Sequence, residues 1–422
     1  MGSPWSRPHP KLWLDMSVLF HLGMFLVAAA VATAAVANDR VRQAIDRATV
    51  YLIQTQQRDG TWNSVVGHEL GETALAGMAI LAGGKPANDL AVLAAATAVR
   101  ERAADDWSTY DTALAIMFLD RLGLPHDSEL LGQLGQRLAG GQGNDGAWTY
   151  SLQRGFGSGG DNSNTQFAAL ASWVSRRHEV GNDAVLQRLD QYFRNSFNPA
   201  DGGWGYSPGF GATPTMTCAG LVGIAIPKGA KGRRTAKEDG GRRGPAAAND
   251  PMARRALEAL GIELKNADRD KTSELNTDLY FFWSLERVAV IYDVKDIGGV
   301  DWYQWGSQRL VAGQSPNGEW RGTSSTKGWP FSQAIGTSFG ILFLSRANVA
   351  ADLTAAIGSG GGVGEPPPGR GGGTPIIGRP MDGDVPPPAV APTPTDSAKR
   401  RPASPRNPPP KPAPGPGVLD PL

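Results

Sequence analysis

The sequence predicts an all-α fold, an (α/α)6 toroid in which an outer ring of helices surrounds an inner ring, followed by a disordered C-terminal tail. Three observations lead to this prediction. A turn with Asp or Asn before Gly, and Trp two residues after that Gly, occurs four times. Six wholly apolar segments each carry a Thr near their start, and a one-sided helical stretch precedes each of them. Recurrence of one unit along the chain is typical of repeat architectures.

The composition bounds the possible partners. The chain has 422 residues, of which 41% are hydrophobic, a formal net charge of +1 and a single Cys. This allows a large core and gives no electrostatic reason to expect a nucleic-acid partner. One Cys also excludes an internal disulfide framework and a multi-Cys zinc site.

The N-terminal segment is typical of an export signal. Arg7 and Lys11 precede an apolar run over residues 16–36, which ends in small residues. We therefore predict a signal peptide over residues 1–37, cleaved after Ala37, and a periplasmic, envelope or secreted protein. The alternative is an uncleaved membrane anchor, because the run is long enough to span a bilayer. A membrane is a partner only if residues 16–36 stay uncleaved.

Two segments have low-complexity composition. Residues 358–422 are rich in Pro and Gly with almost no apolar residues to bury, which predicts a disordered tail. Residues 228–250 carry seven Lys or Arg among Gly and Ala, which predicts a flexible insertion. The segment has no aromatic residues to stack bases, so a nucleic-acid site is not expected there. The repeat domain then covers residues 38–357.

The four turns lie at residues 57–62, 142–148, 198–204 and 314–320. In each, Gly supplies a positive φ, the Asx side chain caps local amides, and Trp packs against a larger surface. The residues expected to have this structural role are Gln57, Gly60, Trp62, Gln142, Gly146, Trp148, Gly202, Trp204, Gln314, Gly318 and Trp320.

The helices are of two kinds. Residues 39–56 place Val41, Ile45, Ala48 and Leu52 on one side, which predicts an amphipathic helix. Similar stretches cover residues 88–102, 127–139, 181–196, 251–263 and 300–313.

The segments that follow are apolar on every face and must be buried on every face. We expect the shared Thr at or beside each helix start, where its hydroxyl can accept backbone amides. These residues are Thr73, Thr112, Thr165, Thr217, Thr277 and Thr337. Six buried helices inside six amphipathic ones form a closed toroid, which leaves no terminal repeat to cap; an open solenoid is the structural alternative.

The repeats resemble a known superfamily. The stretches QQRDGTW, GQGNDGAW and AGQSPNGEW are similar to the QW repeats of squalene-hopene and oxidosqualene cyclases. The resemblance, which covers residues 38–355, implies the toroid shared by terpenoid cyclases and the β subunits of protein prenyltransferases. It also implies that Gln caps backbone groups and that Trp stacks on a neighbouring repeat.

The motifs for the chemistry of that superfamily are incomplete. Class II cyclases protonate an alkene with the middle Asp of DxDDTA, but residues 108–113 read STYDTA. Tyr110, with an ordinary pKa of about 10, cannot replace that acid. Zinc prenyltransferases need a His after the zinc-binding Cys, and none follows Cys218. We therefore expect neither reaction, no metal and no cofactor, with His68 and the other histidines too scattered to indicate a metal site.

Acidic and polar residues at the starts of the inner helices should gather at one rim of the toroid. The alternative, which we favour for most of these residues, is that they cap helix N-termini. A long Gly-rich loop over residues 154–164 is either a lid over this rim or a plain connection. The polar rim residues are Glu69, Glu72, Asp111, Asp161, Asn164, Asn276 and Asp278, and the catalytic candidates among them are Asp111, Glu72, Asp161 and Asp278.

Aromatic residues on the inner helices either line the central cavity or pack in the core. An aromatic wall can hold an isoprenoid. The candidates for ligand contact are Phe118, Trp173, Tyr280, Phe282 and Trp283.

Three hypotheses for the function follow. The first is an exported toroid that binds a hydrophobic, isoprenoid-like ligand or an envelope protein, without standard cyclase or zinc prenyltransferase chemistry. The second is an isoprenoid-processing enzyme whose acid is unidentified, with Asp111 as the best candidate. The third is a polysaccharide hydrolase or lyase, in which two rim carboxyl groups should lie roughly 5 to 10 Å apart across an open cleft.

Overall fold

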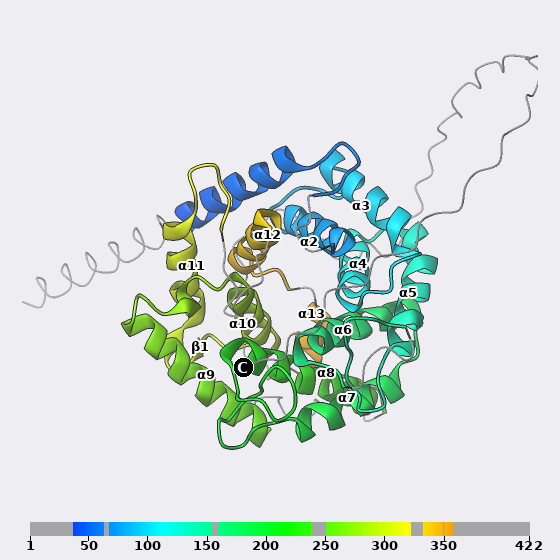
Figure 1. The fold of residues 1–422 in the computed structure, drawn as a ribbon, viewed down its shortest axis with the longest axis vertical. Helices are drawn as coiled ribbons and strands as arrows, with labels where there is room; N and C mark the ends of the chain where they lie inside the picture. The colour runs from blue at the N-terminus through cyan, green and yellow to red at the C-terminus, as the bar shows by residue number, and fades with distance from the viewer. Residues whose placement is uncertain are drawn as a thin grey trace, which may run out of the picture. The chain divides into compact units, whose positions relative to one another are not determined.

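Two concentric rings of helices make up the part of the chain that the computed structural model describes, residues 37–62, 67–153, 159–238, 250–321, 332–348 and 350–357 (Figure 1). Each inner helix contacts the next, and the sixth contacts the first. The predicted closed toroid is therefore confirmed, and the open solenoid is wrong. The inner helices are α2 (Glu69–Ala82), α4 (Thr109–Leu122), α6 (Asn162–Ser175), α8 (Pro214–Glu238), α10 (Leu279–Ile291) and α12 (Gln333–Leu344).

The outer ring consists of amphipathic helices close to the predicted ranges. It begins with a helix over residues 37–55. The others are α3 (Leu90–Ala103), α5 (Ser128–Gly140), α7 (Asp183–Asn195), α9 (Pro251–Arg269) and α11 (Trp302–Gly313). The predicted signal peptide, apart from Ala37, and the predicted tail lie outside the described residues.

Short elements complete the domain. The 3-10 helices are η1 (Pro125–Asp127), η2 (Arg176–His178) and η4 (Glu274–Asn276). Strands β1 (Asp296–Ile297) and β2 (Val300–Asp301) form an antiparallel hairpin in which Asp296 is opposite Asp301. A last helix, α13 (Ala351–Ile357), packs against α8 and α10.

Helix α8 is longer than the sequence predicts. It continues through Pro227 to Glu238, so the first part of the predicted flexible insertion is helical. Lys, Arg and Ala in this part favour a helix. At the start of this extension, Ala230 is buried, and a side chain at Gly229 would meet Leu353 of α13. Residues 239–249 lie outside the described part of the chain.

The four repeat turns share one geometry, as expected. The Gly before the variable residue has φ of +85° at Gly60, +94° at Gly146, +74° at Gly202 and +99° at Gly318. Each Trp indole is buried, and its Nε1–H donates to a backbone carbonyl near the end of the preceding outer helix. In the second turn, for example, Trp148 Nε1 donates to Leu138 O at 2.8 Å. Every turn therefore fixes the end of its own outer helix.

The Gln residues join neighbouring outer helices. Gln142 Nε2 donates to Gly146 O at 2.8 Å and to Val185 O in α7 at 3.0 Å. In the first turn the residue with this role is Gln56, not the predicted Gln57: Gln56 Nε2 donates at 3.0 Å to Gly60 O and to Ala91 O of α3. The reason is the spacing: in the three turns that have this Gln, it lies four residues before the Gly.

The last turn closes the ring. Gln314 Nε2 donates to Gly318 O at 2.9 Å and to Ala44 O of the first outer helix at 2.8 Å. Two junctions between outer helices lack such a turn, and an Arg takes its place. Arg137 of α5 donates to three carbonyls at or after the end of α3. Arg309 of α11 donates to Asn276 of η4 and to Asp268 in the last turn of α9.

Three of the six Thr residues accept the amide of a repeat-turn Trp, and not an amide at the start of their own helix as predicted. The N-cap of α6, for example, is Asp161, whose side chain accepts from Asn164 N. Thr165 lies one turn further on, and its hydroxyl accepts from Trp148 N at 3.0 Å. Thr217 and Thr337 accept from the amides of the Trp residues in the preceding turns in the same way. These three Thr residues therefore join a repeat turn to the following inner helix.

Candidate functional site

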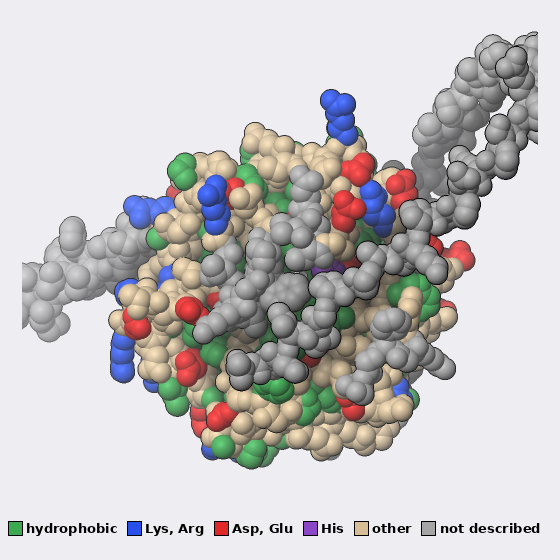
Figure 2. Space-filling view, viewed as in Figure 1, with side chains coloured by type: hydrophobic (Ala, Val, Ile, Leu, Met, Phe, Trp, Pro, Cys, Tyr) green, Lys and Arg blue, Asp and Glu red, His purple; other side chains and the backbone are tan. Residues whose placement is uncertain are grey.

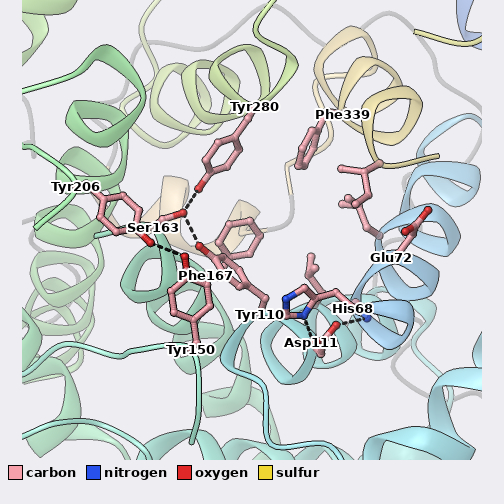
Figure 3. Close-up of a pocket in the computed structure, with 14 residues that line it drawn as sticks. His68, Glu72, Tyr110, Asp111, Tyr150, Ser163, Phe167, Tyr206, Tyr280 and Phe339 are labelled. Atoms are coloured by element: carbon pink, nitrogen blue, oxygen red, sulfur yellow. Dashed lines mark hydrogen bonds and ion pairs between the residues drawn. The ribbon is translucent and has the colours of Figure 1, made fainter. Parts of the chain in front are cut away.

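A cavity of about 410 Å³ lies among the N-terminal turns of the inner helices (Figure 3). Five inner helices contribute to its wall, and two connections between helices contribute one Tyr each. On the uncovered parts of the face shown in Figure 2, Lys and Arg side chains lie among Asp and Glu side chains. The cavity is lined by His68, Gly71, Glu72, Leu75, Tyr110, Asp111, Leu114, Tyr150, Ser163, Phe167, Tyr206, Tyr280, Ile335 and Phe339.

A His–Asp pair lies on one wall. His68 Nδ1 is 2.6 Å from Asp111 Oδ2, and the other carboxylate oxygen accepts from Gly71 N at 2.6 Å. Asp111 is almost fully buried, whereas one third of the His68 side chain is exposed. The hydrogen bond of His68 to the Asp111 carboxylate raises the pKa of His68 above its usual value, against the opposing effect of burial. The pair can therefore hold a proton at a nitrogen beside the cavity.

A chain of hydroxyl groups lies on the opposite wall (Figure 3). Tyr110 O–H donates to Ser163 Oγ at 2.7 Å, and Ser163 Oγ is 2.8 Å from the Tyr280 hydroxyl. Gln166 Nε2 donates to the same Tyr280 oxygen, and Gln166 Oε1 accepts from Arg287 at 3.0 Å. Burial raises the pKa of both Tyr110 and Tyr280, so both remain neutral hydroxyls.

A second hydroxyl pair and several rings complete the wall. The hydroxyls of Tyr150 and Tyr206 are 2.7 Å apart, and burial raises the pKa of Tyr206. The Tyr280 ring stacks on Phe167 and on Phe339, with centroids 6.2 and 5.8 Å away. The cavity thus presents apolar and aromatic surface with a few polar groups at fixed positions, which is typical of small-molecule sites.

Two of the four predicted catalytic residues line the cavity. These are Asp111 and Glu72, whose carboxylate accepts from Ser332 Oγ. Asp161 and Asp278 do not line it; they cap α6 and α10 by accepting from the amides of the third residue beyond them. The capping explanation is therefore correct for this second pair.

Other predicted rim residues have structural contacts. Half of the Glu69 side chain is exposed, and it lies 3.8 Å from Arg102. Asn164 donates to Asp161, and Asn276 donates to the backbone carbonyl of Ala267 in α9 and to that of Asp270 directly after it. Part of the predicted lid, residues 154–158, lies outside the described residues.

Only one of the five predicted ligand contacts, Tyr280, lines the cavity. Phe118 is fully buried against Gly77 of α2, and Phe282 stacks on Trp305 of the outer helix α11. Trp173 donates to Asp352 of α13, away from the cavity.

Trp283, the remaining candidate, lies behind the lining. Its ring stacks on Phe339, with centroids 4.9 Å apart, and the Arg287 guanidinium lies 3.7 Å from its ring centroid. These placements correct the prediction for Phe118, Trp173, Phe282 and Trp283. The reason is that an inner helix has aromatic residues on all faces, and only one face meets the cavity.

The sequence interpretation missed His68, Tyr150, Ser163 and Tyr206 as cavity residues. One signal was present: Tyr150 and Tyr206 each lie two residues after the Trp of a repeat turn. Each of these tyrosines therefore lies in the connection that leads from a repeat turn to the next inner helix. Because the inner helices begin at the rim of the cavity, this connection passes along the rim.

The described residues form neither a metal site nor a membrane-spanning helix. Among them, no three His, Cys, Asp or Glu side chains come together in a way that could hold a metal ion. Cys218 is buried in α8, and burial raises the pKa of its thiol. His178 bonds Asp120 at 2.9 Å. In the same part of the chain, no helix is both long and apolar enough to cross a bilayer.

Comparisons with known proteins give structural matches only. No protein-family model and no curated protein matches the chain. The apo structure of the type II terpene cyclase MstE from Scytonema is similar, with 15% identity and a TM-score of 0.47 over 74% of this chain and 99% of that chain. This likeness is one of fold.

Two complexes of variants of the same enzyme are similar to the same degree. One contains merosterolic acid A (product), with 16% identity over 75% of this chain and 99% of that chain. The other contains geranylgeranyl dihydroxybenzoate (substrate), with 15% identity over 76% of this chain and 98% of that chain. Both have a TM-score of 0.47.

Proposed function

We propose that this protein is an exported toroid that binds a hydrophobic, isoprenoid-like molecule in its central cavity, without standard cyclase or zinc prenyltransferase chemistry. The observation that supports ligand binding is the cavity of about 410 Å³ with its wall of aliphatic and aromatic side chains. Pockets for small molecules have volumes of about 300 to 1,000 Å³ and a mainly apolar lining with few polar groups.

The groups at the STYDTA segment support binding without alkene protonation. Tyr110 donates to Ser163, and burial raises its pKa, so it is a weaker acid than a free Tyr. Both oxygens of Asp111 are engaged by neighbouring groups, one by Gly71 N and the other by His68 Nδ1, each at 2.6 Å, so the carboxyl group is held in place on the cavity wall. Protonation of an unactivated alkene needs a strongly acidic carboxylic acid.

The carboxylates of the cavity do not favour a polysaccharide enzyme. Such an enzyme needs an acid and a second carboxylate across an open cleft. Here Asp161 and Asp278 cap helices, and Asp111 is held by two hydrogen bonds on the same wall as Glu72. The mainly apolar lining is also unsuited to the many hydroxyl groups of a sugar chain.

A second candidate function is an isoprenoid-processing enzyme that uses the pair of His68 and Asp111. The observation that favours it is the 2.6 Å contact between them at the cavity wall, which raises the pKa of His68. An imidazolium near neutral pH can act as a general acid toward a carbonyl or an activated alkene. Turnover of polyprenyl substrates that survives both Asp111→Asn and His68→Gln would exclude the pair.

Lipid extraction and mass spectrometry of the purified full chain test the ligand proposal. We expect an apolar compound that is lost in Leu114→Trp, because the larger side chain would fill the cavity that Leu114 lines. The control is Leu90→Trp at an exposed position on an outer helix, which should retain the compound. Cavities that stay empty in the parent protein, and that take up no added farnesene, would refute the proposal and leave a protein-partner role.

Export is tested by N-terminal sequencing of the protein from its native compartment. The proposal expects a start at Asn38. A start at Met1 or Gly2 would instead indicate that residues 16–36 remain as an anchor.

A further inference from the structure

Hydrogen bonds join Arg287, Gln166, Tyr280 and Ser163 in a chain. Arg287 sets the direction of donation along this chain, because it can only donate. A guanidinium has only donors and stays protonated in proteins. Even with its pKa lowered by burial to about 10, Arg287 is a cation at neutral pH. Since Arg287 donates to Gln166 Oε1, the amide of Gln166 is fixed with Nε2 toward Tyr280.

The direction passes from Gln166 to Ser163. The Tyr280 oxygen accepts from Gln166 and lies 2.8 Å from Ser163 Oγ, a contact in which either oxygen can donate. Donation from Tyr280 to Ser163 continues the direction that Arg287 sets. Tyr110 also donates to Ser163 Oγ, at 2.7 Å. A serine oxygen that accepts two hydrogen bonds retains its own proton for one donation.

Ser163 lines the cavity and is only 5% exposed. A buried hydroxyl proton without an acceptor is unfavourable, so this position selects for an acceptor. We infer that the cavity ligand carries a hydrogen-bond acceptor without need of a donor, a carbonyl oxygen, which binds the Ser163 hydroxyl while the rest of the molecule fills the apolar wall. This inference rests on the proposed function, since it assigns the polar end of the same ligand.

Arg287 acts in this scheme as a positioning residue. It is fully removed from the cavity lining and lies over the rings of Trp283 and Phe167, at 3.7 and 5.4 Å from their centroids. It reaches the ligand only through Gln166, Tyr280 and Ser163. The same hydroxyls in the reverse direction would present an acceptor to the cavity and select a donor.

The variant Gln166→Glu tests the direction with almost no change of shape. A carboxylate at this position accepts from both Arg287 and Tyr280, so the Tyr280 oxygen would then accept from Ser163 and the Ser163 proton would leave the cavity. Three probes that share one chain distinguish the cases: farnesene without a polar group, farnesal with a carbonyl and farnesol with a hydroxyl. Their dissociation constants are measured by calorimetry on the full chain.

For the parent protein we expect farnesal to bind about five- to tenfold more tightly than farnesene, as one hydrogen bond between neutral groups provides. In Gln166→Glu this ratio should fall to about one, while farnesol keeps its advantage over farnesene because its hydroxyl can donate. A control with the same change of charge is Gln308→Glu, at an exposed position on α11, which should keep the parent ratio.

If Gln166→Glu does not fold, Arg287→Met gives the second test, because Gln166 then loses the group that fixes its orientation. The affinity of farnesal should then exceed that of farnesene by less than about threefold. Equal binding of farnesal and farnesene by the parent protein, or an unchanged ratio in the variants, overturns the assignment of the carbonyl but not the cavity function. Failure of all three probes to bind the parent overturns both.

Discussion

Glu286 gives the clearest prediction for stability, because it is a buried acid without a hydrogen bond. It lies on α10 with 1% exposure, and neither carboxylate oxygen has a hydrogen-bond partner among the described residues. Burial raises its pKa to about 8, while the nearby charges of Arg287, Arg121 and Arg346 lower it to a smaller extent. The folded protein therefore holds a proton on Glu286 at pH values where the unfolded chain does not.

The sign of the pH dependence follows from proton binding. Between pH 4.5 and about 8 the folded state binds more protons at Glu286 than the unfolded state, so the free energy of unfolding falls as pH rises through this window. The pKa difference corresponds to a loss on the order of 5 kcal/mol above pH 8. Relaxation around a buried charge reduces the penalty, so we expect about 2 to 4 kcal/mol in experiment.

The variant Glu286→Gln isolates this effect, because the amide resembles the protonated acid. Urea unfolding from pH 5 to 9 should show the variant close to the parent at pH 5 and more stable by about 2 to 4 kcal/mol at pH 9. Glu258→Gln, an exposed position on α9, is the matched control and should show no such trend. A parent protein that is the more stable one at pH 9 would refute the reasoning, because the carboxylate would then gain more from the Arg side chains than it loses by burial.

Three further predictions concern the repeat turns and the cavity. Gln56→Ala should lower the free energy of unfolding, measured by urea unfolding, by about 1 to 3 kcal/mol, because two hydrogen bonds are lost. Gln57→Ala is the control. An equal or larger loss in Gln57→Ala would contradict the conclusion that Gln56 joins the first two outer helices. Gly146→Ala should destabilise by at least about 1 kcal/mol because of its positive φ and its contact with the next outer helix, whereas Gly181→Ala, in open space, should be near neutral in the same assay; similar values would be inconsistent with the turn geometry. His68→Gln should lower the free energy of unfolding by about 1 to 2 kcal/mol at pH 5.5 and by less at pH 9. The reason is that the pKa of His68 is raised in the folded state. The protonated ring therefore stabilises the fold below the unfolded pKa, and this contribution is lost as pH rises through the folded pKa. A loss that does not change with pH would indicate that the imidazolium has no role in the pair.

The sequence predicted the toroid because its signals are local. A positive-φ Gly followed by Trp, and the alternation of amphipathic with wholly apolar helices, are visible within a single repeat. Ring closure also followed, since six such pairs leave no repeat to act as a cap. The Gln that joins two outer helices at the first turn was predicted one residue too late. Gln56 and Gln57 are adjacent, and only the four-residue offset from Gln56 to Gly60 distinguishes them.

The cavity lining was harder to predict for a physical reason. A helix that is apolar on every face gives no indication of its rotation about its own axis. Phe282 and Phe339 are both buried on inner helices, yet Phe282 stacks on the outer ring and Phe339 lines the cavity. The contacts that set this rotation, such as that of Thr165 with the amide of Trp148, join residues 17 positions apart, which the apolar spacing within one helix does not reveal.

The same rotation brings Tyr110 to the cavity wall. Its hydroxyl donates to Ser163, whose oxygen lies 2.8 Å from the Tyr280 hydroxyl. Three neutral hydroxyls joined in one direction can give a hydrogen bond to a ligand, but burial keeps the tyrosines from releasing a proton. A group that binds an oxygen atom without protonating carbon is suited to holding an isoprenoid carbonyl intact. The neutral hydroxyls and the chain from Arg287 thus support the same proposal, a cavity that selects and retains its ligand.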